Sequence, residues 1–345
     1  MKLTCTKVFI FIVVSLISSK IKAQQDPHYS QFMYNKLNFN PGYAGSTDGK
    51  ICATLLNRAQ WLGFGGKNTL DPNSPNPPQG DAPTNLVGSL NAALTPDNSK
   101  FLSRIGLGLV FSKDQLGFET TTMPKFSFAY RHPIGDQSYL SAGVGVGIMQ
   151  KSLDGSKLKS IDPGDPKIPN SMVKGTGTDI DFGLYYTRAS LGGLFDNFYA
   201  GFSTTHVNQS KIAYSWGSNS VIIDNKMHYY FVTGAEYQIN ASLKLQPNII
   251  VKKDPAKLQT DINCFAIIND NIRGGLTFRP MDAVVVLVGY EFPFGLNLGY
   301  SYDLTTSKII KYSSGSHELM IRYCFGIKIP TKVKPIRSRV TPRFM

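Results

Sequence analysis

The sequence predicts an all-β protein, a transmembrane antiparallel β-barrel of probably 14 strands with a short N-terminal helical or plug segment. Three observations support this prediction. The chain begins with a secretory leader. Between Lys50 and Phe325, stretches of about ten residues recur in which apolar and polar positions alternate. Long and short connections mostly alternate between these stretches, as expected for an outer-membrane barrel, which has longer loops at one end and short turns at the other.

The leader is a predicted signal peptide covering residues 1–23. Lys2 and Lys7 give it a positive start, residues 8–17 form an apolar run, and Ala23 precedes the expected cleavage site. The apolar run is too short to remain as a transmembrane helix. We therefore expect the chain to be exported.

Residues 24–49 form a predicted N-terminal periplasmic or plug segment with helical rather than strand periodicity. Its apolar side chains at helical spacing are Tyr29, Phe32, Met33 and Leu37. Asp26 can cap a helix that has Pro27 at its first position, and residues 40–42, Asn-Pro-Gly, would end it. We expect this segment to fold into or under the barrel mouth as a plug or docking element. A loose leader that orders only on binding a partner is the alternative.

The barrel itself is predicted over residues 50–326. The alternating stretches lie near residues 50–60, 84–94, 103–113, 122–132, 137–151, 177–187, 196–206, 226–237, 242–252, 258–268, 270–279, 283–291, 294–304 and 317–326. A soluble β-sandwich also alternates, but its strands would have about five or six residues. The face opposite the apolar one holds Gly, Ser, Thr, Asn and sparse charge, which is typical of a barrel interior.

The connections predict which end of the barrel faces outward. The long ones, at residues 61–83, 152–176, 207–225 and 305–316, all fall at one end. The tight ones, at 133–136, 238–241, 269 and 292–293, fall at the other. Because outer-membrane barrels have short periplasmic turns and longer outward loops, both chain termini are expected in the periplasm.

Residues 327–345 form a predicted basic periplasmic tail. Its cations include Lys332, Lys334, Arg337, Arg339 and Arg343, and it contains no acid. Without the leader, the chain keeps 32 basic and 23 acidic side chains, so the body is only mildly basic, which argues against nucleic-acid binding. The tail is either a disordered solvated peptide or a grip on acidic protein surface or anionic envelope polymer.

The sequence predicts no enzyme, no cofactor and no metal site. His317 and Glu318 are adjacent on a strand, so they face opposite sides of the wall and cannot act as a catalytic pair. Asp179 and Asp181 come closest to a metal-binding pair, but we interpret them as lumenal wall residues.

The cysteines left after the leader are Cys52, Cys264 and Cys324. Because their number is odd and no CxxC spacing occurs, the sequence indicates neither a disulfide framework nor a zinc site. We interpret all of them as small apolar wall residues.

A set of polar residues is predicted to face the barrel interior. It comprises Lys125, Arg131, Asp181, Lys244, Gln246, Asn248, Gln259, Asp261, Asn263, Arg273, Arg279, Asp303, Glu318 and Arg322. These residues suit a hydrogen-bonded, charge-balanced lumen. A conduction pathway or a docking surface is the alternative.

Several motifs occur in an order that resembles one family. They are Asp26-Pro27-His28-Tyr29-Ser30-Gln31-Phe32, Asn40-Pro41-Gly42-Tyr43-Ala44-Gly45, Arg58 with Gln60 and Trp61, Asp254-Pro255 with Asp261 and Asn263, Gly275-Leu276 with Arg279, Gly299-Tyr300-Ser301-Tyr302-Asp303, and Gly315-Ser316-His317-Glu318. The ordered set is similar to the PorP/SprF outer-membrane proteins of the type IX secretion system in Bacteroidetes. Ala59, Arg273 and the basic tail depart from the family pattern.

The resemblance implies a barrel of the cell outer membrane that works in protein secretion and gliding motility. It implies as partners a secreted cargo protein, received or anchored through its C-terminal domain, other secretion-system components and outer-membrane lipid. The family-motif wall and loop residues are Arg58, Gln60, Trp61, Asp261, Asn263, Arg279, Tyr300, Tyr302, Asp303, His317 and Glu318. The alternatives are a FadL-like outer-membrane transporter of small hydrophobic ligands, which requires a continuous apolar pocket leading to a wall opening, and a purely structural barrel.

Overall fold

The computed structural model describes residues 26–47, 49–64, 82–94, 104–135, 137–158, 162 and 164–326. The predicted signal peptide (1–23), most of the loop at 61–83 and the basic tail (327–345) lie outside the described residues, so the expectations for them stay predictions.

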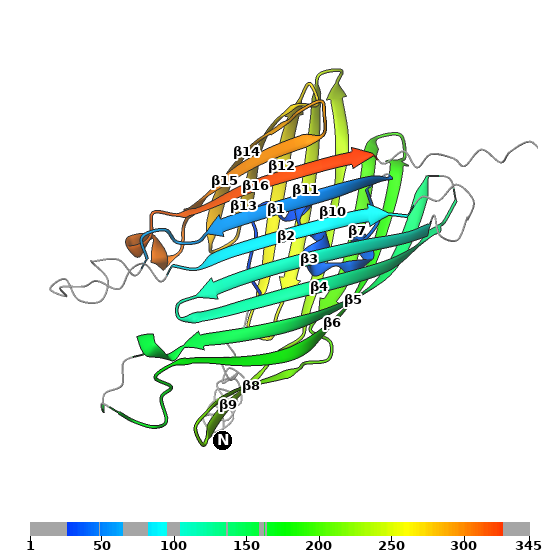
Figure 1. Ribbon diagram of the computed structural model, residues 1–345. Coiled ribbons are helices and arrows are strands. Elements are labelled where there is room, and N and C mark those ends of the chain that lie inside the picture. The colour runs from blue at the N-terminus through cyan, green and yellow to red at the C-terminus, as the bar shows by residue number, and fades with distance from the viewer. Residues whose placement is uncertain are drawn as a thin grey trace, which may run out of the picture.

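Fourteen strands close into one antiparallel barrel, as the sequence predicts (Figure 1). They are β1 (Lys50–Ala59), β2 (Thr84–Ala93), β3 (Ile105–Leu116), β4 (Glu119–Pro133), β5 (Ser138–Asp154), β6 (Met172–Leu191), β7 (Phe195–Thr205), β10 (His228–Asn240), β11 (Leu243–Lys253), β12 (Leu258–Ile268), β13 (Ile272–Arg279), β14 (Ala283–Glu291), β15 (Leu296–Thr305) and β16 (Ser316–Gly326). The ring closes where β1 pairs with β16. A closed sheet leaves no backbone edge, which the hydrocarbon of a bilayer requires.

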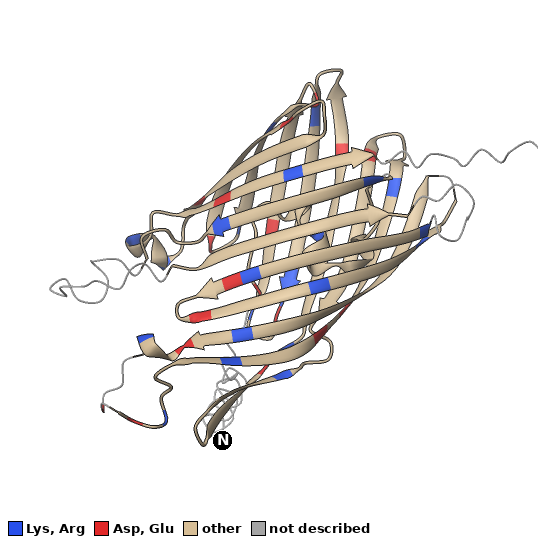
Figure 2. Ribbon diagram, viewed as in Figure 1, with Lys and Arg blue, Asp and Glu red and all other residues tan. Residues whose placement is uncertain are grey.

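The wall is apolar outside and polar inside. Leu109, Ile148 and Leu319 are among the outward side chains, each more than half exposed. Their strand neighbours point into the barrel and are small, polar or buried. Figure 2 shows that charged residues occupy few positions on the strands and that long uncharged stretches lie between most of them. Among the described residues, no helix is long and apolar enough to cross a membrane.

One element was missed by the sequence prediction. The expected loop at 207–225 contains a two-stranded hairpin, β8 (Lys211–Trp216) and β9 (Asn219–Asp224), which is separate from the barrel sheet. Ile212 and Tyr214 are buried, and Ile212 lies over Gly175 and Gly177 of β6. The apolar residues at alternate positions 212 and 214 could have indicated a strand. A strand of six residues, however, is shorter than the strands of about ten residues expected for the wall.

Some strands are longer than predicted. β3 and β4 run to within two residues of each other, where the sequence pattern ended at 113 and began again at 122. β6 has 20 residues, so it extends beyond the wall and carries the β8–β9 hairpin. Two short 3-10 turns, η4 (Gly155–Lys157) and η5 (Lys308–Tyr312), lie in the long loops.

Residues 26–47 lie inside the barrel, and we call them the plug (Figure 1). The predicted single helix capped by Asp26 is wrong. The plug instead makes three short turns, η1 (Phe32–Tyr34), α2 (Lys36–Phe39) and η2 (Pro41–Tyr43). Asn40 ends α2 as expected and then caps η2, because its side chain accepts a hydrogen bond from Gly42 N at 2.9 Å. Contacts with the surrounding wall override the helical pattern.

The predicted apolar stripe of the plug is its buried face. Tyr29, Phe32, Met33 and Leu37 have exposed fractions between 2% and 6% and belong to one hydrophobic cluster. The same cluster includes inward wall residues such as Leu56 and Met320. The hydrophobic core of this protein is therefore the contact between plug and wall.

Glycines on the inner face of the wall let the plug backbone approach. A Cβ added at Gly106 would lie 2.1 Å from Ala44 O, and one at Gly143 would lie 2.5 Å from Pro41 O. These contacts explain why the interior faces of β3 and β5 are rich in glycine, since any larger side chain would exclude the plug.

Replacing Gly106 by valine should push the plug away from β3. Overpacking of this kind costs about 1–3 kcal/mol, so the free energy of unfolding should fall and single-channel conductance should rise. Gly274→Val is the matched control, because an added Cβ there meets nothing within 4 Å. Equal conductance in the two variants would contradict the assigned plug path.

Candidate functional site

Two arginines and three acids of the inner wall form a buried cluster at the loop-bearing end of the barrel. Arg58 Nη2 lies 2.8 Å from Asp303 Oδ2, and Arg58 Nη1 lies 3.4 Å from Glu318 Oε2. Arg279 Nη2 lies 2.9 Å from Asp261 Oδ2, and its Nη1 lies 3.1 Å from Asp303 Oδ2. All five side chains are at most 3% exposed. We call these five residues the lumenal ion cluster.

The plug completes the lumenal ion cluster. Ser30 N and Gln31 N each donate a 2.8 Å hydrogen bond to the Glu318 carboxylate. Ser30 Oγ donates to Asp303 and accepts from Arg58 Nη1 at 2.9 Å and Arg279 Nη2 at 3.3 Å. The cluster has three carboxylates but only two guanidinium groups, and a buried charge without partners is costly. The hydrogen bonds from the plug supply the missing partners and so hold the plug at this position.

His28 of the plug binds the third acid. Its Nε2 lies 2.8 Å from Asp261 Oδ2. Burial, together with the charge of Arg279, lowers the pKa of His28. The imidazole is therefore neutral and donates its single N–H to Asp261.

Deeper in the barrel, Lys36 of the plug occupies a cage of tyrosine rings. Its Nζ lies 3.4 Å from the ring centre of Tyr199 and within 6 Å of those of Tyr43 and Tyr185, and donates a 3.3 Å hydrogen bond to Tyr185 Oη. Such rings stabilise an ammonium group. Burial nonetheless lowers the pKa of Lys36 from 10.5 to about 7.

The low pKa of Lys36 predicts a pH dependence of plug binding. Between about 7 and 10.5 the unfolded chain holds the Lys36 proton and the folded chain does not. The free energy of unfolding should therefore rise with pH through this window. In Lys36→Met this rise in the free energy of unfolding should shrink. Relative to wild type, the variant should be most stable below pH 7, where the buried lysine of the wild type is charged. Denaturant midpoints of both proteins across the window test this, and parallel curves would refute it.

The first described residue, Asp26, is bound at the same end of the barrel as the lumenal ion cluster. Its Oδ1 lies 2.9 Å from His206 Nε2, and its Oδ2 lies 2.8 Å from His228 Nδ1 and accepts a 2.7 Å hydrogen bond from Tyr230 Oη. Lys252 Nζ donates to the Asp26 carbonyl at 2.5 Å. The plug therefore crosses the lumen from the loop-bearing end to the end where β1 begins.

These neighbours shift the pKa values at Asp26 and at His206, which follows β7. Burial alone would raise the pKa of Asp26, but His228 and His206 hold it well below its usual value. Burial alone would lower the pKa of His206, but Asp26 and Asp179 raise it to about 10. Asp26 is therefore a carboxylate.

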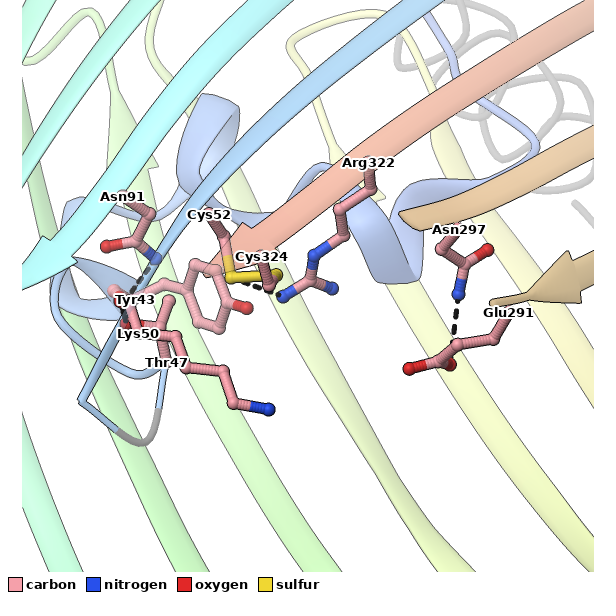
Figure 3. Close-up of a disulfide and its surroundings, with 9 residues drawn as sticks. All are labelled: Tyr43, Thr47, Lys50, Cys52, Asn91, Glu291, Asn297, Arg322 and Cys324. Carbon is pink, nitrogen blue, oxygen red and sulfur yellow. Dashed lines mark hydrogen bonds between the residues drawn. A yellow bond between two sulfur atoms is a disulfide. The ribbon is translucent and has the colours of Figure 1, made fainter. Parts of the chain in front are cut away.

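A disulfide joins the first and last strands. Cys52 of β1 and Cys324 of β16, which are 272 positions apart in the sequence, are bonded across the closing seam (Figure 3). The interpretation of both as apolar wall residues is wrong. Cys264 is free and exposed. The seam also holds the plug, because Asn91, which pairs with Cys52 in the register of β1 and β2, accepts a 2.7 Å hydrogen bond from Gly45 N.

The structure divides the predicted family-motif residues into groups. Arg58, Asp261, Arg279, Asp303 and Glu318 meet in the lumenal ion cluster. Asn263 faces the lumen but bonds to Asn248 and Thr277 instead. Gln60 and Trp61 lie where β1 ends, and Trp61 N donates to Ser316 Oγ at 3.0 Å.

The remaining family-motif residues lie on the outside of the wall. Tyr300 Oη and His317 Nδ1 are 2.7 Å apart in an exposed pair, and the Tyr302 ring lies 5.0 Å from the same imidazole in a tilted orientation. They do not take part in the lumenal ion cluster. Their position agrees with the expectation that His317 and Glu318 face opposite sides.

Sequence reasoning missed the contacts of Asp26, His206 and His228, and the tyrosine cage of Lys36. Residues of these groups come from the plug and from strands far apart in the sequence, so no spacing revealed them. Asp179 was interpreted only as a wall residue. Its Oδ1 also lies within hydrogen-bond distance, 2.6 Å, of His206 Nδ1.

A closed barrel with an apolar outer wall and a polar, plugged lumen defines an outer-membrane β-barrel protein. The chain belongs to the PorP/SprF family, because the family described as "Type IX secretion system membrane protein PorP/SprF" matches residues 21–323. It is thus a membrane component related to type IX secretion, as the motifs indicated.

Solved barrels resemble the chain only distantly. The toluene transporter TbuX of Ralstonia pickettii is 12% identical, with a TM-score of 0.47 over 84% of this chain and 92% of that one. A FadL homologue of Pseudomonas aeruginosa is 12% identical, with a TM-score of 0.45 over 83% and 91%. The translocator domain of NalP from Neisseria meningitidis is 13% identical, with a TM-score of 0.38 over 81% and 88%. No curated protein matches the chain.

Proposed function

We propose that this protein is a non-enzymatic outer-membrane component of the type IX secretion and gliding machinery that receives or anchors a secreted cargo protein at the cell surface. The observation that carries this proposal is the plug. The lumen is occupied by the chain's own residues 26–47, which are held through Ser30 and Gln31 by the lumenal ion cluster. A lumen filled in this way favours a docking platform over an open conduit.

Two cavities beside the plug, both lined by described residues, are small. They measure about 80 and 30 Å³ and are lined in part by charged side chains such as Asp26 and Lys252. A larger apolar hollow of about 910 Å³ is lined by outward side chains including Leu90, Leu109 and Phe126. This hollow is on the membrane-facing side of the wall, so it does not supply the continuous lumenal pocket that a FadL-like transporter of hydrophobic ligands needs.

The loop-bearing end offers a surface for a protein partner. The β8–β9 hairpin and the turn η5 lie there (Figure 1). Val221 and Ile222 of β9 are 50% and 61% exposed. Exposed apolar side chains on a polar rim are typical of protein-binding surfaces. We propose that this end faces outward, with the tight turns in the periplasm.

Co-purification from detergent-solubilised outer membrane tests the proposal. A tagged chain should enrich a secreted protein together with other secretion-system components. The double variant Val221→Ser/Ile222→Ser should recover at least tenfold less cargo, because the apolar contact is lost. Lys211→Ser, at an exposed polar position of the same hairpin, should recover as much as wild type.

The outcome against the proposal is also clear. If the wild-type chain enriches no secreted protein beyond an unrelated barrel, cargo anchoring is wrong. Uptake of a hydrophobic compound by proteoliposomes that contain the wild-type chain would support the transporter instead.

A further inference from the structure

Three side chains that can bind a metal ion meet at the loop-bearing end of the lumen. Asp26 belongs to the plug, His206 directly follows β7, and His228 begins β10. One potential ligand atom from each lies within 4.8 Å of the other two. Two imidazoles and a carboxylate are the donors that first-row transition-metal ions prefer.

The second nitrogen of His206 is already oriented. His206 Nδ1 lies 2.6 Å from Asp179 Oδ1, while Nε2 points to Asp26. Metal-binding histidines usually donate their other ring N–H to a carboxylate, which fixes the ring and makes the ligand nitrogen more basic. Asp179 is in the position of such an outer carboxylate.

His228 is buried against the plug carboxylate. It is 2% exposed, and its Nδ1 lies at an ion-pair distance of 2.8 Å from Asp26 Oδ2 without the geometry of a hydrogen bond, while its Nε2 has no hydrogen-bond partner. Buried polar atoms are nearly always hydrogen-bonded, so this arrangement is unusual for an imidazole beside a carboxylate. A metal ion between Nδ1 and the carboxylate would replace the direct contact.

The site has room for an ion and for a water ligand. The cavity of about 80 Å³ is lined by all three residues. Tetrahedral zinc with bonds of about 2.0–2.1 Å separates its ligand atoms by roughly 3.3 Å. The two imidazole–carboxylate distances, 2.9 Å at His206 and 2.8 Å at His228, are within a few tenths of an ångström of that spacing, and the ligand atoms of the two histidines lie within 4.8 Å of each other.

A second group of possible ligands, Asp179, Asp181 and His206, is less suitable. Lys125 Nζ forms an ion pair with Asp181 and lies 4.0 Å from Asp179 Oδ2, so an ammonium group already occupies that position. The metal position is therefore the one beside Asp26.

We propose that Asp26, His206 and His228 bind one divalent transition-metal ion, for which Zn²⁺ is the probe, with Asp179 orienting His206. The ion bridges the plug to β7 and β10. Since it requires the plug in place, it acts as a latch on the loop-bearing end of the plug. Ca²⁺, which takes oxygen ligands, does not replace Zn²⁺.

Metal analysis of the purified full-length chain tests the latch. The protein is prepared in detergent with a purification tag free of histidine, loaded with Zn²⁺, dialysed, and titrated against a chromophoric chelator at slightly alkaline pH, where protons compete less for imidazole. We expect one Zn²⁺ per chain. His206→Ala and His228→Ala should each bind at least tenfold more weakly, and His317→Ala, which alters the outer-wall histidine, should bind like wild type.

A second readout covers the case in which a histidine variant does not fold. Asp26→Asn keeps the side-chain volume and changes only the plug, so the wall should still close. Zn²⁺ should raise the temperature at which wild-type protein loses its compact form on unheated gels, and this rise should disappear in Asp26→Asn. The proposal is overturned if wild type retains no Zn²⁺, or if Asp26→Asn or a folded His228→Ala binds and responds as wild type does.

Discussion

Arg58→Met should destabilise the protein by about 3–5 kcal/mol, because it removes the guanidinium group that pairs with the buried Glu318 and one of the two that pair with the buried Asp303. Arg58 is 2% exposed and contacts Asp303, Glu318 and Ser30 Oγ. Methionine fills a similar volume without a charge. The loss in free energy of unfolding therefore comes mainly from the broken ion pairs and not from an empty cavity. The change should also loosen the plug at Ser30 and increase channel conductance.

Denaturant unfolding in micelles, together with conductance in planar bilayers, checks this result. Lys244→Met is the control, since Lys244 pairs with Asp270 at a solvent-accessible position where the partner is 72% exposed. Such a pair contributes at most about 1 kcal/mol. Comparable losses in the two variants would show that the lumenal ion cluster does not hold the structure together.

Removing the disulfide should lower stability by roughly 2–5 kcal/mol. The bond connects residues 272 positions apart and therefore restricts nearly the whole unfolded chain. The double variant Cys52→Ser/Cys324→Ser avoids a stray thiol. Its denaturant midpoint should fall below that of wild type under oxidising conditions, and the two should converge when wild type is reduced.

Thiol counting supplies the control. If the predicted signal peptide, which contains Cys5, is removed on export, the unreduced wild-type protein should expose one reactive thiol after unfolding, that of Cys264. Cys264→Ser should leave the midpoint nearly unchanged, because this side chain is exposed on the membrane-facing side of β12. Three reactive thiols, or equal midpoints for the double variant and wild type, would exclude a stabilising disulfide.

Alternation predicted the wall because a two-residue period is a local property. Each wall strand faces lipid on one side and the lumen on the other. The apolar or polar character of a residue, such as Leu319 or Glu318, therefore indicates the side on which it lies. The same rule could not find β8 and β9, which are short and lie outside the wall. It also could not follow the plug, whose turns depend on contacts with glycines of distant strands.

The site was predictable only in part. Inward charges such as Arg279 and Asp303 were identified, but which acid meets which arginine depends on strand register and on the path of the plug. The disulfide shows the same limit: Cys52 and Cys324 meet because β1 and β16 close the ring in one register. An odd cysteine count concealed the pair, since Cys264 remains free.

The central claim is that residues 26–47 close the lumen of a membrane barrel. Single-channel conductance of wild type and of a variant that lacks these residues tests it most directly, with gel mobility to confirm that both barrels are closed. We expect little conductance from wild type and a large, steady conductance from the deletion variant. Equal conductance in the two proteins would contradict the claim.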